Sequence, residues 1–145
     1  MSDPTHRQGH PVSVKGVVLV DGRVLLLRND RDEWELPGGR PDADETWPQA
    51  LARELLEEAN VGVEVGALIA EWPYEVLPGR FVWIAAYGCW PATVASPRLS
   101  EEHRELRFFD LADLDGFDLH DGYRDAIEAW TAMERRAPPF SGSSR

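Results

Sequence analysis

The sequence predicts a single domain of the α/β class. Its 145 residues fit one domain and suffice to bury a core without disulfide bonds. Apolar and β-branched runs typical of strands alternate with two segments that have helical spacing. We expect the domain to span residues 12–136, between a flexible polar arm at residues 1–11 and a disordered Pro- and Ser-rich tail at residues 137–145.

The first element is expected to be a β-hairpin. Residues 12–20 (VSVKGVVLV) and 23–28 (RVLLLR) are apolar runs separated by Asp21-Gly22, a pair typical of tight turns with positive φ. Residues 37–39 (PGG) follow, and we expect the backbone to leave regular structure there and to approach a ligand closely.

A helix is predicted from about Trp47 to Ala59. Thr46 and Gln49 have the spacing of a capping box, and Pro48 is tolerated in a first helical turn. Asn60 follows the predicted end, where a left-handed residue is common and asparagine is the best substitute for glycine.

The second half of the chain is predicted to complete the sheet. Residues 61–72 and 80–90 are strand-like and are joined by an expected loop at residues 73–79. A short strand is expected around residues 106–109. A final helix is expected over residues 121–136, with one apolar stripe formed by Ile127, Trp130 and Met133.

One segment carries a specific spacing of charged residues. In order it contains Gly39, five residues, Glu45, seven residues, Arg53-Glu54-Leu55-Leu56-Glu57-Glu58, two residues and Val61. This segment resembles the signature of the Nudix hydrolases, G-x5-E-x7-R-E-U-x-E-E-x-G-U with U aliphatic. It departs from that pattern only at the second glycine, which is Asn60 here.

The resemblance implies an α/β/α sandwich with a mixed sheet between helices. It also implies Mg²⁺- or Mn²⁺-dependent cleavage of a phosphoanhydride in a nucleoside diphosphate linked to another moiety. The substrate is left open among a nucleoside triphosphate, ADP-ribose, a nucleotide sugar and a dinucleoside polyphosphate. The metal ligands implied are Glu54, Glu57, Glu58 and the backbone of Gly39, with Arg53 and Glu45 in supporting roles.

Elementary geometry agrees with a metal site on this helix. Glu54, Glu57 and Glu58 lie at i, i+3 and i+4, so we expect the three carboxylates to reach a common point. Their mutual repulsion favours a hard divalent cation with oxygen ligands. A solvated helix face is the alternative, but such a face would not require the fixed offsets of Gly39 and Glu45.

The general base is assigned less directly. The resemblance places it on the signature helix or in a later acidic loop, which here is residues 100–105. We favour Glu102, with Glu58 as the alternative, and Glu57 completes the catalytic candidates. A solvated turn explains the acidic loop equally well.

Residues beyond the signature must recognise the rest of the substrate. Arg28 and Arg40 flank the Gly-rich turn and could contact phosphates. Four aromatic residues could stack on a base, although aromatic side chains in strands more often belong to a core: Trp34, Tyr74, Phe81 and Trp83. Tyr74 is the favoured candidate because it falls in the expected loop.

Composition limits the other function classes. A net charge of −11 without a basic cluster argues against binding of a nucleic-acid duplex, and no apolar run approaches the roughly 20 residues that span a membrane. Cys89 is the only cysteine and the start lacks signal-peptide features, so we expect a cytoplasmic protein. Cys89 itself is expected to be buried in a strand. A homodimer is possible by analogy with the family.

Two other hypotheses for the function of this chain remain open. The chain could be a catalytically inactive nucleotide-sensing or partner-binding module with the same fold, although retention of all three glutamates argues against it. It could also be an acidic interaction protein without a ligand site. Stabilisation by divalent cations would distinguish that last possibility.

Overall fold

The computed structural model describes residues 3–92 and 105–136. Its helices and strands are listed here in chain order: β1 (His6–Arg7), β2 (His10–Val20), β3 (Arg23–Arg28), β4 (Trp34–Glu35), β5 (Gly38–Gly39), α1 (Trp47–Ala59), β6 (Val63–Leu77), β7 (Arg80–Pro91), β8 (Glu105–Asp110), the 3₁₀ helix η1 (Leu111–Leu114) and α2 (Asp121–Arg136).

The strands form one mixed sheet. The central order is β4-β3-β2-β7-β6, with β1 and β5 also paired to β2, and β8 paired to β3. The β2–β7 pair is parallel and the other pairs are antiparallel. The predicted turn between β2 and β3 is confirmed, because Asp21 has a φ of 51° and Gly22 a φ of 77°.

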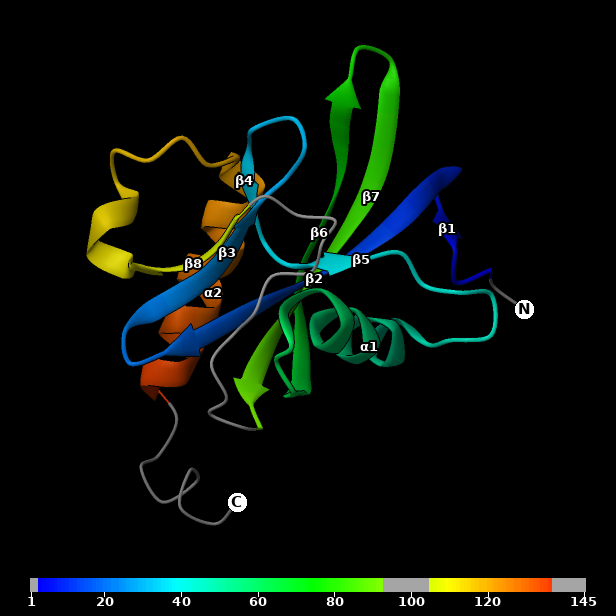
Figure 1. Cartoon of the computed structure of the whole chain (residues 1–145). Coiled ribbons are helices and arrows are strands. Elements are labelled where there is room, and N and C mark those ends of the chain that lie inside the picture. The colour runs from blue at the N-terminus through cyan, green and yellow to red at the C-terminus, as the bar shows by residue number, and fades with distance from the viewer. Residues whose placement is uncertain (1–2, 93–104, 137–145) are drawn as a thin grey trace.

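The sheet separates two hydrophobic cores, one under each helix (Figure 1). Alternate residues of the inner strands face opposite sides: Val18 and Leu25 pack towards α1, whereas Val17 and Leu26 pack towards α2. Burial on both faces explains why β2 and β3 are almost continuously apolar. The predicted α/β/α sandwich with a mixed sheet between helices is therefore confirmed.

Helix α1 has the predicted boundaries and caps. The Thr46 side chain accepts a hydrogen bond from the backbone N–H of Gln49, and the Gln49 side chain accepts one from the Thr46 N–H. Asn60 ends the helix in the left-handed conformation, with a φ of 56° and a ψ of 38°, and its N–H bonds to the last turn. The departure from the signature thus keeps the backbone conformation that a glycine would adopt there.

The conformation of Asn60 gives a stability prediction. Replacing Asn60 by alanine is expected to lower the free energy of unfolding by about 1 kcal/mol, because alanine adopts the left-handed region less readily than asparagine. Asn60→Gly is the matched control and should keep or raise stability. Urea denaturation of the three proteins checks this, and equal midpoints for all three would contradict it.

Three local expectations were wrong. Residues 6–7 and 10–11 lie in strands rather than in a flexible arm, because β1 pairs with the start of β2. Residues 73–77 continue β6 instead of forming a loop, because pairing with β7 carries Pro73 opposite Trp83, and only Pro78-Gly79 remains for the turn. Gly38–Gly39 form a short strand against β2, not an irregular turn.

The apolar stripe expected on α2 is also partly wrong. Ile127 and Trp130 are buried against the sheet, but Met133 is 42% exposed. Trp130 packs directly on the backbone of β7, since a Cβ added at Gly88 would lie 2.1 Å from its ring. Cys89, on the same strand, is 1% exposed, as expected, and burial raises the pKa of its thiol to about 12.

No helix within the described residues is long and apolar enough to cross a membrane. The predicted tail at residues 137–145 lies outside the described residues.

Candidate active site

The signature loop and helix meet at the Gly-rich strand β5. The backbone N–H of Gly38 donates a 2.6 Å hydrogen bond to Oε1 of Glu58 on α1. A Cβ at Gly38 would lie 1.8 Å from the carbonyl oxygen of Val14, and a Cβ at Gly39 would lie 2.3 Å from Cδ of Glu54. Gly38 is therefore required because β5 lies too close to the backbone of β2 for a larger residue, whereas a larger residue at position 39 would displace the Glu54 carboxylate.

Arg53 joins the loop to the helix, as the sequence predicted. Its Nε and Nη2 donate hydrogen bonds of 2.6 and 2.8 Å to the two carboxylate oxygens of Glu45. Its Nη2 also donates to the carbonyl oxygen of Arg40 at 3.1 Å. The hydrogen bonds from Arg53 lower the pKa of Glu45 to about 2. The bidentate pair fixes the loop in one orientation relative to α1.

The three signature glutamates do not converge on one point in this structure. Glu57 is held by Arg53 at 3.0 Å on the exposed rim, Glu54 packs against Gly39, and Glu58 is buried beside the Gly38 N–H. Among the described residues, no three His, Cys, Asp or Glu side chains are grouped to hold a metal ion. The expected convergence is therefore not observed: Glu54 and Glu57 both accept hydrogen bonds from Nη1 of Arg53, at 3.2 and 3.0 Å, whereas Glu58 accepts one from the Gly38 N–H.

The glutamates nonetheless fit a divalent cation by their chemistry. Burial raises the pKa of Glu58 to about 7 and also raises that of Glu54. These two carboxylates have lost water that would otherwise stabilise their charge, and a cation would replace that stabilisation. Carboxylate oxygens from α1 and backbone carbonyl oxygens from the glycine strand β5 are the kind of ligands that Mg²⁺ or Mn²⁺ prefers.

A buried ion pair beside Glu58 was missed by the sequence analysis. Lys15 on β2 is 6% exposed, and its Nζ donates a 2.7 Å hydrogen bond to Oε1 of Glu35. Asn29 donates to Oε2 of Glu35 at 2.9 Å. Burial opposes both charges, but the attraction between them raises the pKa of Lys15 and lowers that of Glu35. A lysine inside the apolar run VSVKGVVLV was the signal that could have found this pair.

The comparisons with known proteins agree with this geometry. A family model described as the NUDIX domain matches residues 9–130. The chain belongs to the Nudix family.

Three similar proteins illustrate the range of the resemblance. A MutT-like protein from Streptomyces ambofaciens is 51% identical over 61 residues, which are 41% of this chain and 40% of that protein. A CTP pyrophosphohydrolase from Escherichia coli (strain K12) is 34% identical over 79 residues, 51% of this chain and 58% of that protein. The chain thus spans only part of both curated relatives. The crystal structure of a MutT protein from Methanosarcina mazei Go1 matches with a TM-score of 0.72 at 27% identity, over 86% of this chain and 95% of that chain.

Two adjoining cavities lie beside the Nudix loop, which is the segment 40–46 between β5 and α1, and Tyr74 lines both cavities. The smaller, about 110 Å³, has three cationic side chains in its lining, from Lys15, Arg31 and Arg40. The larger, about 250 Å³, is lined by Asp32, Glu33, Trp34, Tyr74, Asp118 and His120. Tyr74 lies in strand β6 rather than in a loop, so the reason for choosing it was wrong although it borders both cavities.

Of the two arginines predicted to contact phosphate, Arg40 lines a cavity and Arg28 is held in ion pairs. Arg40 is exposed and lines the smaller cavity. Arg28 instead forms ion pairs with Asp32 at 2.6 Å and with Glu105 at 3.3 Å, so its charge is already matched by two carboxylates. Glu102, the favoured general base, lies outside the described residues.

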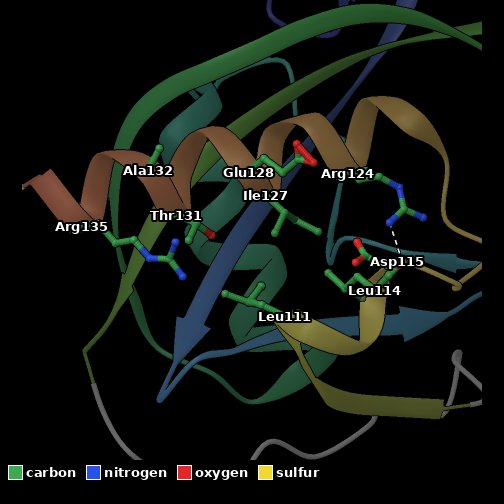
Figure 2. A pocket seen from close by; sticks show the side chains of 9 residues that line it. All are labelled: Leu111, Leu114, Asp115, Arg124, Ile127, Glu128, Thr131, Ala132 and Arg135. Carbon is green, nitrogen blue, oxygen red and sulfur yellow. Dashed lines mark hydrogen bonds between the residues drawn. The ribbon is translucent and has the colours of Figure 1, made fainter.

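A third cavity, of about 270 Å³, lies between α2 and η1 (Figure 2). Arg124 links the two elements by donating to the carbonyl oxygens of Leu114 and Phe117 at 2.5 and 2.7 Å. None of its lining residues belongs to the Nudix loop or to α1, so it is separate from the candidate active site.

Proposed function

We propose that this chain is a Mg²⁺- or Mn²⁺-dependent pyrophosphohydrolase that cleaves a phosphoanhydride in a nucleoside diphosphate linked to another moiety. One observation carries the proposal: Arg53 clamps Glu45 with two hydrogen bonds while the Gly-rich strand lies directly against Glu54 and Glu58. That arrangement serves no evident purpose on a merely solvated helix, whereas it holds oxygen ligands in place for a cation.

The residues present would hold the metal and position the substrate. Glu54, Glu57, Glu58 and the backbone carbonyl of Gly39 would be the ligands, and the cation would neutralise phosphate charge and acidify a water molecule. Glu58 is the described residue best suited to accept a proton, because burial raises its pKa to about 7. Glu102 and Glu57 remain candidates for the same role.

The cationic cavity is suited to the phosphate chain of the substrate. Lys15, Arg31 and Arg40 line it together with Glu35. Lys15 is paired with Glu35 and Arg31 with Glu33, whereas Arg40 is exposed and follows directly after Gly39. Guanidinium and ammonium groups recognise phosphate oxygens by charge-assisted hydrogen bonds. The substrate is expected to be a nucleoside triphosphate, ADP-ribose, a nucleotide sugar or a dinucleoside polyphosphate, and the name of the E. coli relative specifies CTP. Cytoplasmic location and homodimer formation stay predictions.

The proposal is tested by incubating the chain with this panel of substrates, with and without Mg²⁺, and measuring release of nucleoside monophosphate and phosphorylated products. Metal-dependent release from at least one compound is expected. A chain that is stabilised by nucleotides but releases no product from any compound would instead be the inactive sensing module.

Arg53→Ala should weaken metal binding without changing the choice of substrate. Loss of the clamp would free Glu45 and the loop, and the Mg²⁺ concentration at half-maximal activity should rise about tenfold. Arg135→Ala, an exposed residue on α2, is the control. Measuring activity against Mg²⁺ concentration checks this, and an unchanged titration in Arg53→Ala would refute the assigned role.

A further inference from the structure

The N-terminal segment is fastened to the start of helix α1. Strand β1 forms a hairpin with β2, and the backbone N–H of Val12 donates a 2.8 Å hydrogen bond to the carbonyl oxygen of Thr5. Just before β1, the carbonyl oxygen of Pro4 accepts a 2.8 Å hydrogen bond from Nε1 of Trp47, the first residue of α1 (Figure 1). This hydrogen bond joins the N-terminal hairpin to the signature helix.

Arg7 adds a second connection at the same place. Its Cζ atom lies 5.5 Å from the ring centre of Trp47 and 5.8 Å from the ring centre of Trp83, so the guanidinium contacts two indoles. Nη2 of Arg7 also lies 3.7 Å from Oε1 of Glu71, which accepts a 2.9 Å hydrogen bond from Nε1 of Trp83. One cation therefore links β1, α1 and the two long strands β6 and β7.

These contacts lie at one end of the Nudix loop. The other end begins at β5, which is fixed by its pairing with β2. Trp47 follows the N-cap of α1, and Glu45, which Arg53 clamps, lies just before that cap. Strand β1 and strand β7 belong to the same sheet as β5. Arg7 and Trp47 therefore connect the helix end of the loop to the sheet that holds its other end.

We propose that Arg7 and Trp47 are positioning residues of the active site. They hold the start of α1 against the sheet and thereby keep the Nudix loop and the glutamates of α1 in the geometry that binds a cation. Both act through the loop and the helix, and neither is assigned a contact with the substrate or the cation. The inference rests on the proposed function, because it takes the glutamates of α1 to be ligands of a divalent cation.

The size of the effect follows from preorganisation. A loop that is already held in its bound conformation costs less to order when a ligand binds, so its contacts add to affinity without touching the ligand. A cation–π contact at an exposed site changes an equilibrium constant about two- to fivefold. Arg7→Ala should therefore raise the dissociation constant of Mn²⁺ about threefold. Because the Arg7 side chain is exposed, its removal should leave the fold intact.

Two measurements on the full chain test the role of Arg7. Calorimetric titration gives the dissociation constant of Mn²⁺ without substrate. Hydrogen exchange in the metal-free chain reports the opening of residues 45–50, which contain the hydrogen-bonded amides at the end of the loop and in the first helical turn. These amides should exchange about threefold faster in Arg7→Ala. Arg7→Lys should restore most of both values, because an ammonium group can also stack on an indole and pair with Glu71.

Arg23→Ala is the matched control for Arg7→Ala. Arg23 is also an exposed arginine, and its 3.2 Å ion pair joins it to Asp110. The two residues lie on β3 and β8, which form no part of the Nudix loop or of α1. Arg23→Ala should therefore keep the native exchange rates and the native affinity for Mn²⁺.

Trp47→Phe tests the other connection separately. Phenylalanine keeps an aromatic ring for Arg7 but cannot donate to the carbonyl oxygen of Pro4. The amides of residues 45–50 should therefore exchange about fivefold faster, the effect of one hydrogen bond. Native exchange in Trp47→Phe would overturn the role of Trp47.

The outcomes for Arg7 decide the rest of the inference. Faster exchange and weaker Mn²⁺ binding in Arg7→Ala, restored in Arg7→Lys and absent from Arg23→Ala, support it. Native values in Arg7→Ala, equal changes in Arg23→Ala or no recovery in Arg7→Lys overturn it. Native Mn²⁺ binding in Arg7→Ala despite faster exchange contradicts the positioning role and leaves the proposed function intact. No Mn²⁺ binding by the native chain contradicts the proposed function and the positioning role together.

Discussion

Glu58→Gln is expected to lower kcat at least about 100-fold while the fold stays intact. Glu58 is buried, and burial raises the pKa of its carboxyl to about 7, so the side chain is suited to exchange a proton near neutral pH. The glutamine side chain keeps a carbonyl oxygen that can accept the hydrogen bond from the Gly38 N–H. It cannot supply a negative charge to a cation or take up a proton.

Activity and thermal stability of Glu58→Gln should be measured together with those of Glu57→Gln and Glu128→Gln. Glu57→Gln should also lose activity if Glu57 is a metal ligand, although it lies on the exposed rim. Glu128 is exposed on α2, so its variant should behave like the native chain. Native activity in Glu58→Gln with unchanged melting temperature would remove Glu58 from the catalytic residues and would point towards Glu102 or Glu57.

Lys15→Met is expected to lower the free energy of unfolding by about 3 kcal/mol at neutral pH. The substitution keeps a side chain of similar length in β2 but leaves Glu35 charged in a buried position without its cationic partner. Removing one partner of a buried ion pair is strongly destabilising because the remaining charge is no longer compensated. Chemical denaturation gives the change directly.

The pH dependence identifies the cause of that destabilisation. Lys15 lowers the pKa of Glu35 below its ordinary value of 4.5, so in the native chain this pair contributes stability above that pH and loses it as the pH falls. In Lys15→Met the attraction and hydrogen bond of Lys15 are lost, whereas burial, the largest influence, still raises the pKa of Glu35 and only the weaker effects of Asn29 and Arg31 lower it. Protonation of Glu35 on acidification should therefore remove part of the destabilisation of the variant. The difference between the two proteins should therefore shrink as the pH falls from neutral to about 4.

The double variant Lys15→Met with Glu35→Gln is the control, because it removes both charges. It should recover most of the lost stability, since a glutamine at position 35 can still bond to Asn29. A single variant that is as unstable at pH 4 as at neutral pH, or a double variant with no recovery, would show that Lys15 acts through packing and not through its charge.

The sequence by itself determined the local elements and the signature. The limits of α1 follow from the Thr46–Gln49 capping box and from Asn60, and the turn between β2 and β3 follows from Asp21-Gly22. These features depend on neighbouring residues, which the sequence displays directly. The clamp of Arg53 on Glu45 was predictable for a related reason, because it joins a helix to the loop immediately before it.

Tertiary structure decided the contacts between distant segments. The strand that carries Tyr74 continues through the expected loop because its pairing with β7 stabilises it, and no local pattern displays that pairing. The Lys15–Glu35 pair and the placement of Asp118 beside Tyr74 likewise join residues brought together only by the order and register of the sheet. Local patterns therefore predicted the limits of α1 and the first turn, and the resemblance of residues 39–61 to the Nudix signature implied the phosphoanhydride chemistry. The cavity that would recognise the rest of the substrate required the assembled sheet, because its walls come from strands and loops far apart in the chain.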